Sequence, residues 1–159
     1  MVIMILWFNR QQPAQIETAL KPDIRPRQLT SLLGVEEMPS FSRDGRYMAF
    51  MADAPGQAPG IFRLDLQQMS KAAVRLTPEH QYATAPAWSP DQQQLAYLAV
   101  QQNDCQVRVL DLTSDQTATL ANCFHQHLQN TLSWSASTNM LAFAAVNELG
   151  GVNLSLIHI

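Results

Sequence analysis

A ten-residue unit occurs three times in this 159-residue chain and restricts its fold more than any other feature. The copies are residues 41–50 (FSRDGRYMAF), 88–97 (WSPDQQQLAY) and 134–143 (WSASTNMLAF). Each copy begins with an aromatic residue and Ser, and ends with Ala and a second aromatic residue. The starts at 41, 88 and 134 are 47 and 46 residues apart. Such a fixed period is typical of repeat proteins, in which each repeat is one supersecondary unit.

Each period contains four short segments with strand character, separated by clusters of turn-forming residues. In the first period these segments are residues 40–42, 46–52, 61–66 and 73–77. Four antiparallel strands per period of this length are the content of one propeller blade. The sequence therefore predicts an all-β chain that forms a partial β-propeller of four-stranded antiparallel blades.

The repeat also predicts the domain boundaries. We expect blades at about residues 39–77, 86–121 and 132–153, where the last is incomplete. Residues 27–31 (RQLTS) resemble the end of the first blade, because Leu29 and Leu76 each lie twelve residues before the next opening aromatic residue. The prediction is therefore a propeller over residues 27–153, with about two and a half blades plus a leading strand. Such an incomplete propeller would leave sheet edges uncovered at both ends, which favours association.

The repeated residues have structural roles in this interpretation. The opening aromatic residues are expected to fill the space between blades, since a twisted four-stranded sheet is stable only when neighbours cover its faces. The Asp and Gly residues are typical of the turn that follows. The structural repeat residues are Phe41, Asp44, Gly45, Phe50, Trp88, Asp91, Tyr97, Trp134 and Phe143.

The two ends of the chain differ from the repeats. Residues 1–8 (MVIMILWF) are wholly apolar and too few to cross a bilayer. They predict either a buried strand or the last turns of a membrane helix, and Trp7 at the polar boundary favours the helix remnant. Residues 9–26 carry three prolines and are predicted to be a linker.

Composition argues against nucleic-acid binding by this segment. Ten basic residues face 13 acidic ones, for a net charge of −3. Binding to phosphate backbones requires a concentrated basic face, and here Lys and Arg are scattered. No group of residues predicts a catalytic site, a cofactor or a metal centre.

Three sets of polar residues nevertheless have a functional alternative. His125 and His127 could hold a metal ion, although a solvated loop is the ordinary explanation. Asp44 and Asp91 could bind calcium, but a turn-forming Asp explains them as well. The blade residues Asp65 and Asp111 are expected to form hydrogen bonds within their blades. Glu36 and Glu37 are predicted to lie in a loop between blades, as solvated charges or partner contacts.

Two interpretations of the cysteines stay open. Cys105 and Cys123 could be free buried thiols. Alternatively, a hairpin that turns near residues 113–116 places them opposite each other, within about one residue of register. An oxidising compartment would then allow a disulfide, whereas an offset of one residue would put the side chains on opposite faces.

The repeat resembles the TolB-type propeller repeat, whose pattern runs Leu-Thr, a loop, Pro-x-Trp-Ser-Pro-Asp-Gly, a strand ending in Ala-Phe, and an Ile-Tyr-x-x-Asp strand. The second copy departs from it at Gln92, and the third lacks the Pro, Asp and Gly. The pattern is specific for the fold and weak for function. The first copy matches it at Leu29, Thr30, Pro39, Phe41, Ser42, Asp44, Gly45, Ala49, Phe50, Ile61, Phe62 and Asp65.

Residues 154–159 (LSLIHI) do not continue this pattern. They resemble the translation of a transposon end sequence used to build sequencing libraries. We therefore expect a non-native scar here and a strand that ends at residue 153, with a native strand as the alternative.

An apolar segment, a proline-bearing linker and a Leu-Thr opening resemble the extracytoplasmic half of CadC-type membrane-anchored winged-helix transcriptional regulators. This resemblance implies a non-catalytic sensor or protein-interaction propeller in the periplasm, anchored in the inner membrane. Its partner would be another protein or an envelope signal. Two alternatives are a soluble TolB-like envelope scaffold and the propeller cap of a prolyl-oligopeptidase-like serine peptidase.

Overall fold

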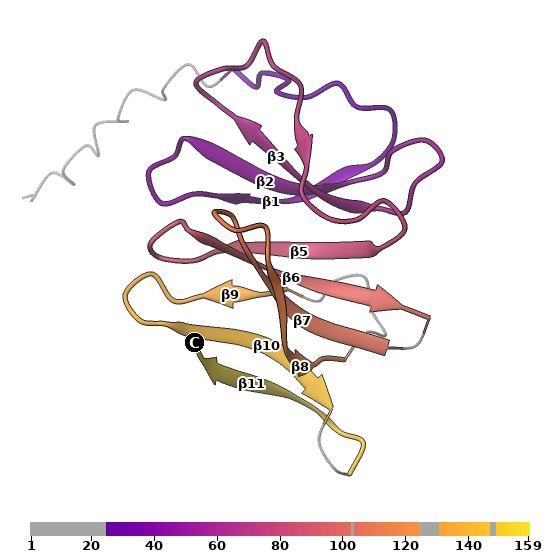
Figure 1. Cartoon of the computed structure of the whole chain (residues 1–159), viewed down its shortest axis with the longest axis vertical. Coiled ribbons are helices and arrows are strands. Elements are labelled where there is room, and N and C mark those ends of the chain that lie inside the picture. The colour runs from indigo at the N-terminus through magenta and orange to yellow at the C-terminus, as the bar shows by residue number, and fades with distance from the viewer. Residues whose placement is uncertain (1–24, 103, 125–130, 147–148) are drawn as a thin grey trace, which may run out of the picture.

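The computed structural model describes residues 25–102, 104–124, 131–146 and 149–159. These residues form three antiparallel sheets that lie one above another, as blades of a partial propeller (Figure 1). All regular elements among them are strands. Blade 1 has four strands in the order of the chain: β1 (Glu36–Phe41), β2 (Tyr47–Ala52), β3 (Gly60–Asp65) and β4 (Val74–Arg75).

Blade 2 repeats this order with longer strands, and blade 3 has three strands with β10 in the middle. The expectation of an all-β partial propeller is therefore confirmed. The strands of blade 2 are β5 (Tyr82–Trp88), β6 (Gln94–Gln101), β7 (Asp104–Asp111) and β8 (Thr117–Asn122). Those of blade 3 are β9 (Ser133–Trp134), β10 (Met140–Val146) and β11 (Val152–His158).

The second strand of a blade is apolar on both faces because both faces are covered. Five of the six residues of β2 and five of the eight residues of β6 are buried. One face of β6 packs toward blade 1 through Leu95, Tyr97 and Ala99. The other packs toward blade 3 through Ala96 and Leu98. A continuous apolar run is the expected pattern for a strand that is buried in this way.

Blades 1 and 2 pack through small residues and one aromatic pair. Ala49 and Ala83 are fully buried in the shared cluster, and their size lets the two sheets approach closely. The ring of Trp88 stacks on that of Tyr47, with centroids 6.1 Å apart. Its indole Nε1 donates a hydrogen bond to the backbone oxygen of Ser40, at 3.1 Å. Trp88 therefore joins blade 2 to blade 1 by both apolar and polar contact.

The inner strands, which are the first strand of each blade, begin earlier than the sequence predicts in blades 1 and 2. The first segment of blade 1 is expected at residues 40–42, next to Pro39, and blade 2 from about residue 86, at Pro86. In the structure, β1 and β5 run through these prolines, and each has an irregularity in register there. The residue before each proline, Met38 or Ala85, has a positive φ, 55° or 53°. Such a bulge tolerates a proline because the ladder does not require its missing N–H.

Phe41 corrects the expectation that every opening aromatic residue fills a space between blades. Trp88 is 8% exposed and Phe41 is 57% exposed. The reason is the direction of packing, since Trp88 packs on blade 1 and Trp134 packs on a cluster that includes blade 2. Among the described residues, blade 1 has no preceding sheet on which Phe41 could pack in the same way.

The predicted leading strand at residues 27–31 is also wrong. Residues 25–34 form no strand and cross the outer face of blade 1, where Leu32 packs against the cluster around Phe50 and Phe62. The last strand of a blade needs hydrogen bonds from the strand before it. Among the described residues, no strand lies beside residues 27–31 to provide them. Thr30 Oγ1 instead donates to the carboxylate of Glu36.

The strand expected to end at residue 153 continues to His158. All seven residues of β11 pair with β10, from Val146↔Val152 to Met140↔His158. The alternating apolar residues of this segment suit a strand, and the edge of β10 offers it backbone partners. The assignment of residues 154–159 as a scar stays a prediction.

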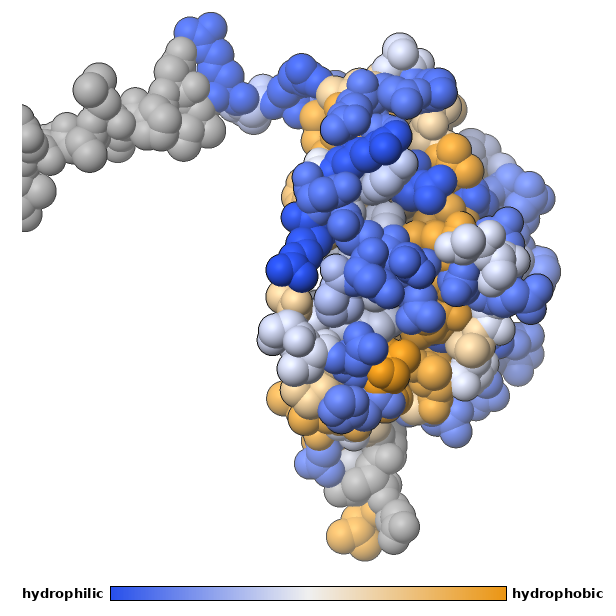
Figure 2. Space-filling model, turned by 60° about the vertical axis from the view of Figure 1, so that its left-hand side comes forward, coloured by the Kyte–Doolittle hydropathy of each residue, from blue (hydrophilic) through white to orange (hydrophobic). Residues whose placement is uncertain are grey.

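Leu154 and Leu156 are 87% and 68% exposed on the outer face of blade 3. Apolar residues reach the surface elsewhere too, in a band flanked by polar residues (Figure 2).

Residues 1–8 and most of the linker predicted at 9–26 lie outside the described residues. Within the described part of the chain, no helix is long and apolar enough to span a membrane.

Candidate functional site

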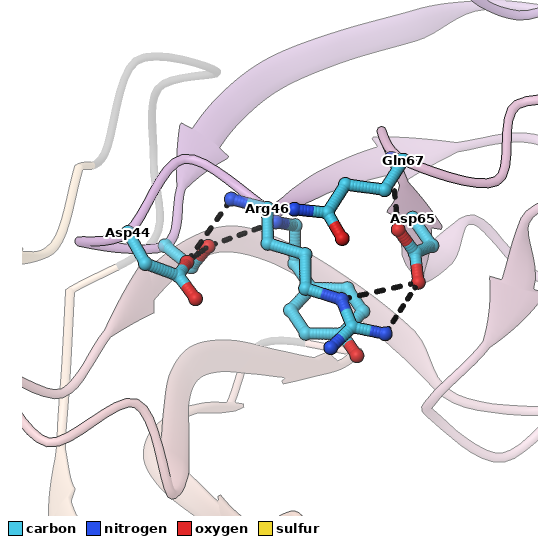
Figure 3. Close-up of polar contacts among 6 residues, drawn as sticks. Asp44, Arg46, Asp65 and Gln67 are labelled. Carbon is cyan, nitrogen blue, oxygen red and sulfur yellow. Dashed lines mark hydrogen bonds and ion pairs between the residues drawn. The ribbon is translucent and has the colours of Figure 1, made fainter.

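The turn between the first two strands of blade 1 is built around Asp44 (Figure 3). Its Oδ1 accepts hydrogen bonds from Ser42 Oγ, at 2.6 Å, and from the backbone N–H of Arg46, at 3.0 Å. Ser42 Oγ in turn accepts from the N–H of Tyr47, at 2.8 Å. Gly45 has a φ of 70°, which suits glycine. The Ser and Asp of the repeat therefore hold the turn.

Blade 2 reproduces this turn although Gln92 replaces the glycine. Asp91 Oδ1 accepts from Ser89 Oγ at 2.6 Å and from the N–H of Gln93 at 3.0 Å. Gln92 adopts a φ of 64°, a conformation that costs a residue with a side chain roughly 1–2 kcal/mol. Its Oε1 accepts a hydrogen bond from the N–H of Asp44, at 3.2 Å. This contact between blades offsets part of the cost.

The carboxylates of these turns have lowered pKa values. The hydroxyls of Ser42 and Ser89 are the main cause for Asp44 and Asp91 respectively, because they donate to the charged form. These oxygens are engaged in turn contacts, so a turn role accounts for both residues without calcium. Within the described ranges, no group of three His, Cys, Asp or Glu side chains could hold a metal ion.

The aspartates on the third strands also form hydrogen bonds within their blades. Desolvation raises the pKa of Asp65. Hydrogen bonds from the Arg46 guanidinium and the Gln67 N–H lower it by more, so the pKa lies below its usual value. Arg46 Nη2 lies 3.1 Å from Asp65 Oδ2 (Figure 3). In blade 2, the backbone N–H groups of Ser114 and Thr113 donate to the Asp111 carboxylate and lower its pKa.

A groove of about 310 Å³ lies where the opening residues of the three blades meet. Phe41 is its most exposed aromatic residue, at 57%. Arg43 reaches across it from blade 1, with Nη1 3.5 Å from the backbone oxygen of Ala136 in blade 3. The residues that line the groove include Phe41, Arg43, Trp88, Pro90 and Trp134.

The indole of Trp134 differs from that of Trp88. Its Nε1 is buried and has no hydrogen-bond partner in the described part of the chain, whereas Trp88 Nε1 donates to Ser40. An unpaired buried donor is costly, so an acceptor that reached Trp134 Nε1 would be stabilised there. The sequence placed these aromatic residues between blades and did not predict the groove. The sequence did contain a signal for the groove, because Phe41, Trp88 and Trp134 occupy the same repeat position at the end of the first strand of each blade.

Residues 5–159 match the family model described as the TolB beta propeller domain. The chain belongs to this family. No curated protein sequence matches it significantly.

Solved TolB-type and related propellers resemble the chain in fold. TolB from Acinetobacter baumannii aligns with a TM-score of 0.64 and 22% identity, over 82% of this chain and 32% of that one. The β-propeller domain of the Trilobed protease from Pyrococcus furiosus aligns at 0.60 and 16%, over 79% and 39%. Acylaminoacyl peptidase from Pyrococcus horikoshii aligns at 0.53 and 16%, over 70% and 17%. The chain thus spans less than half of each structure's length.

The TolB-type chain contains one disulfide, which joins the third and fourth strands of blade 2. The Cα atoms of Cys105 and Cys123 lie 4.9 Å apart. The N–H of Cys123 donates to the backbone oxygen of Cys105 at 2.8 Å, which continues the register Gln106↔Asn122. The two cysteines therefore lie directly opposite each other on one face.

The remaining polar candidates do not gather at the groove. Glu36 and Glu37 lie in β1 and not in a loop, and the Glu36 carboxylate accepts from Thr30 and from the N–H of Leu32. His125 and His127 lie outside the described residues.

Asp91→Asn tests the electrostatic part of the turn, because it keeps an acceptor oxygen and removes the charge. The folded-state pKa of Asp91 is depressed, so its contribution to stability is present above the unfolded-state pKa and is lost as the pH falls through the folded-state pKa. We expect the variant to be less stable than wild type at neutral pH. The difference should shrink below about pH 4.

Urea unfolding at a series of pH values measures this difference. Asp115→Asn is the control, since its carboxylate is exposed and has no hydrogen-bond partner among the described residues. If the difference in unfolding free energy between Asp91→Asn and wild type stays constant with pH, the charge of Asp91 has no role in stability.

Proposed function

We propose that this TolB-type propeller recognises another protein through the groove formed by Phe41, Arg43, Trp88, Pro90 and Trp134, and that it is not catalytic. The observation that carries the proposal is the groove itself, about 310 Å³ where the opening residues of three blades meet, beside a buried Trp134 Nε1 that has no hydrogen-bond partner among the described residues. The exposed Phe41, the half-buried Trp134 and the buried Trp88 together give the groove an aromatic lining.

The composition of the groove fits a protein partner. Aromatic residues and Arg are enriched among the interface residues that contribute most to binding energy, because they bury large areas and combine apolar and polar contact. Arg43 adds a cation, and its hydrogen bond to the backbone oxygen of Ala136 is long, at 3.5 Å. A partner segment with apolar side chains and a carbonyl or carboxylate acceptor would complement this surface.

We further propose that the propeller is the periplasmic sensor of a membrane-anchored transcriptional regulator. The apolar residues 1–8, followed by a proline-bearing linker at 9–26, support an anchor in the inner membrane. The Cys105–Cys123 disulfide is compatible with an oxidising compartment such as the periplasm. The signal would then be another protein or an envelope component, and any DNA contact would belong to another domain.

Two other assignments fit the same fold. A soluble TolB-like envelope scaffold would use the groove in the same way without an anchor. A propeller cap of a serine peptidase is consistent with the peptidases among the structural neighbours. The regulator is favoured over both by the apolar segment at residues 1–8.

A photo-crosslinking amino acid at position 41 tests recognition by the groove. We expect a specific adduct with one protein in cells of the source organism, because the side chain projects from the groove. Position 74 is the matched control, since Val74 is 56% exposed and lies on the outer strand of blade 1. The additional change Arg43→Ala should weaken the adduct. Equal adducts from both positions, or none from position 41, would contradict the proposal.

The genomic reading frame tests the regulator assignment. We expect about ten further apolar residues directly upstream of residue 1, which would complete a membrane helix of roughly 20 residues. A basic winged-helix domain should precede them, and the frame should depart from this sequence after residue 153. A cleavable signal peptide upstream would indicate the soluble scaffold. A Gly-x-Ser-x-Gly motif downstream would indicate the peptidase cap.

A further inference from the structure

A second concave site lies in blade 2, away from the groove. It is a cleft of about 200 Å³ between the start of β5 and the β6–β7 hairpin, with Ala99 and Val100 as apolar lining. Its polar lining consists of His80, Gln81, Gln101, Asp104, Gln106 and Arg108. None of these residues lines the groove.

The repeat explains why blade 2 has this cleft. Arg108 and Phe62 are equivalent, since each lies three residues before the aspartate that ends the third strand. In blade 1, the residue opposite Phe62 is Arg75, whose guanidinium lies 5.4 Å above the Phe62 ring. In blade 2, the residue opposite Arg108 is Thr119. Thr119 is exposed and too short to cover Arg108 as Arg75 covers Phe62.

The two arginines also differ in their hydrogen bonds. The Arg75 guanidinium donates to backbone oxygens of Thr77, Ala58 and Pro78, at 2.8–2.9 Å. These bonds tie β4 to the loop before β3 and to the segment that follows β4. They also require Gly60, because a Cβ there would lie 2.3 Å from Arg75 Nη2. Arg75 is therefore a structural residue whose donors are used.

Arg108 has spare donors. Its Nε and Nη2 both donate to Gln106 Oε1, at 3.0 and 2.7 Å. In the part of the chain that the structure describes, it has no other hydrogen bond and no ion pair. Gln106 occupies the edge formed by Nε and Nη2. The adjacent edge, formed by Nη1 and the second N–H of Nη2, is left. Two parallel N–H donors on a half-buried guanidinium match the two oxygens of a carboxylate.

We propose that this cleft binds a carboxylate, carried either by a small organic acid or by the end of a peptide, with Arg108 as the anchor. Gln81 and Gln101 supply neutral hydrogen-bonding groups, and His80 adds a ring N–H. Asp104 lies four residues from Arg108 along β7, roughly 13 Å at strand spacing, and is exposed at the mouth. Water therefore screens its repulsion of the bound anion.

Titration of the isotope-labelled full chain with succinate, followed by the NMR signal of the Arg108 Nε–H group, tests this proposal. Succinate should cause a saturable shift and the uncharged succinamide should not. Arg108→Gln should weaken binding by at least about tenfold, because it removes the charge-assisted pair; in that variant the backbone amides of β7 report binding. Arg108→Lys should give intermediate affinity, since it keeps the charge without the two-pronged geometry.

Arg63→Gln is the matched control, because Arg63 is also half-buried on a third strand and lies over the Tyr47 ring. It should bind succinate as wild type does. A short peptide with a free C terminus, compared with its amidated form, distinguishes a peptide end from a free acid as the source of the carboxylate. No saturable shift with either probe, or unchanged binding by Arg108→Gln, would overturn the proposal.

Discussion

The packing of one blade on the next is the interaction on which the rest of this structure depends. A single twisted sheet of four short strands has two faces to cover, and its own residues cover neither. Here β6 is covered on both faces, by blade 1 on one side and by blade 3 on the other. Alanines at the contact allow close approach, and the stacked rings of Tyr47 and Trp88 fill the space at its inner end.

The same packing decides what a repeated residue does. Trp88 packs on the preceding blade and is buried, whereas Phe41 has no preceding blade among the described residues and is exposed. The groove lies where Phe41, Trp88 and Trp134, the same repeat position of three blades, meet. The cleft at Arg108 also involves a change at a repeat position, because Arg108 stands where blade 1 has Phe62 and Thr119 stands opposite it in place of Arg75. Both candidate sites are therefore departures from the repeat within a fold that the repeat specifies.

The sequence predicted the architecture well because its period and its alternation of strands and turns are local signals. The two full blades and the turns around Asp44 and Asp91 follow from them. The strands β1 and β5 start earlier than predicted, because the bulges before Pro39 and Pro86 are set by pairing in the sheet and have no local sequence signal. Residues 27–31 look like a strand by repeat position, but strand formation also needs a neighbour to pair with. The groove and the cleft could not be predicted, because each depends on which side chains from different blades meet.

The most direct test of this account compares Trp88→Ala with Phe41→Ala in urea unfolding. Trp88 is buried between blades, so its truncation should destabilise the protein by about 3–5 kcal/mol, whereas Phe41→Ala should cost less than about 1 kcal/mol. Equal losses of stability for the two variants would contradict the claim that the covering blade, and not the repeat position, determines the role of these residues.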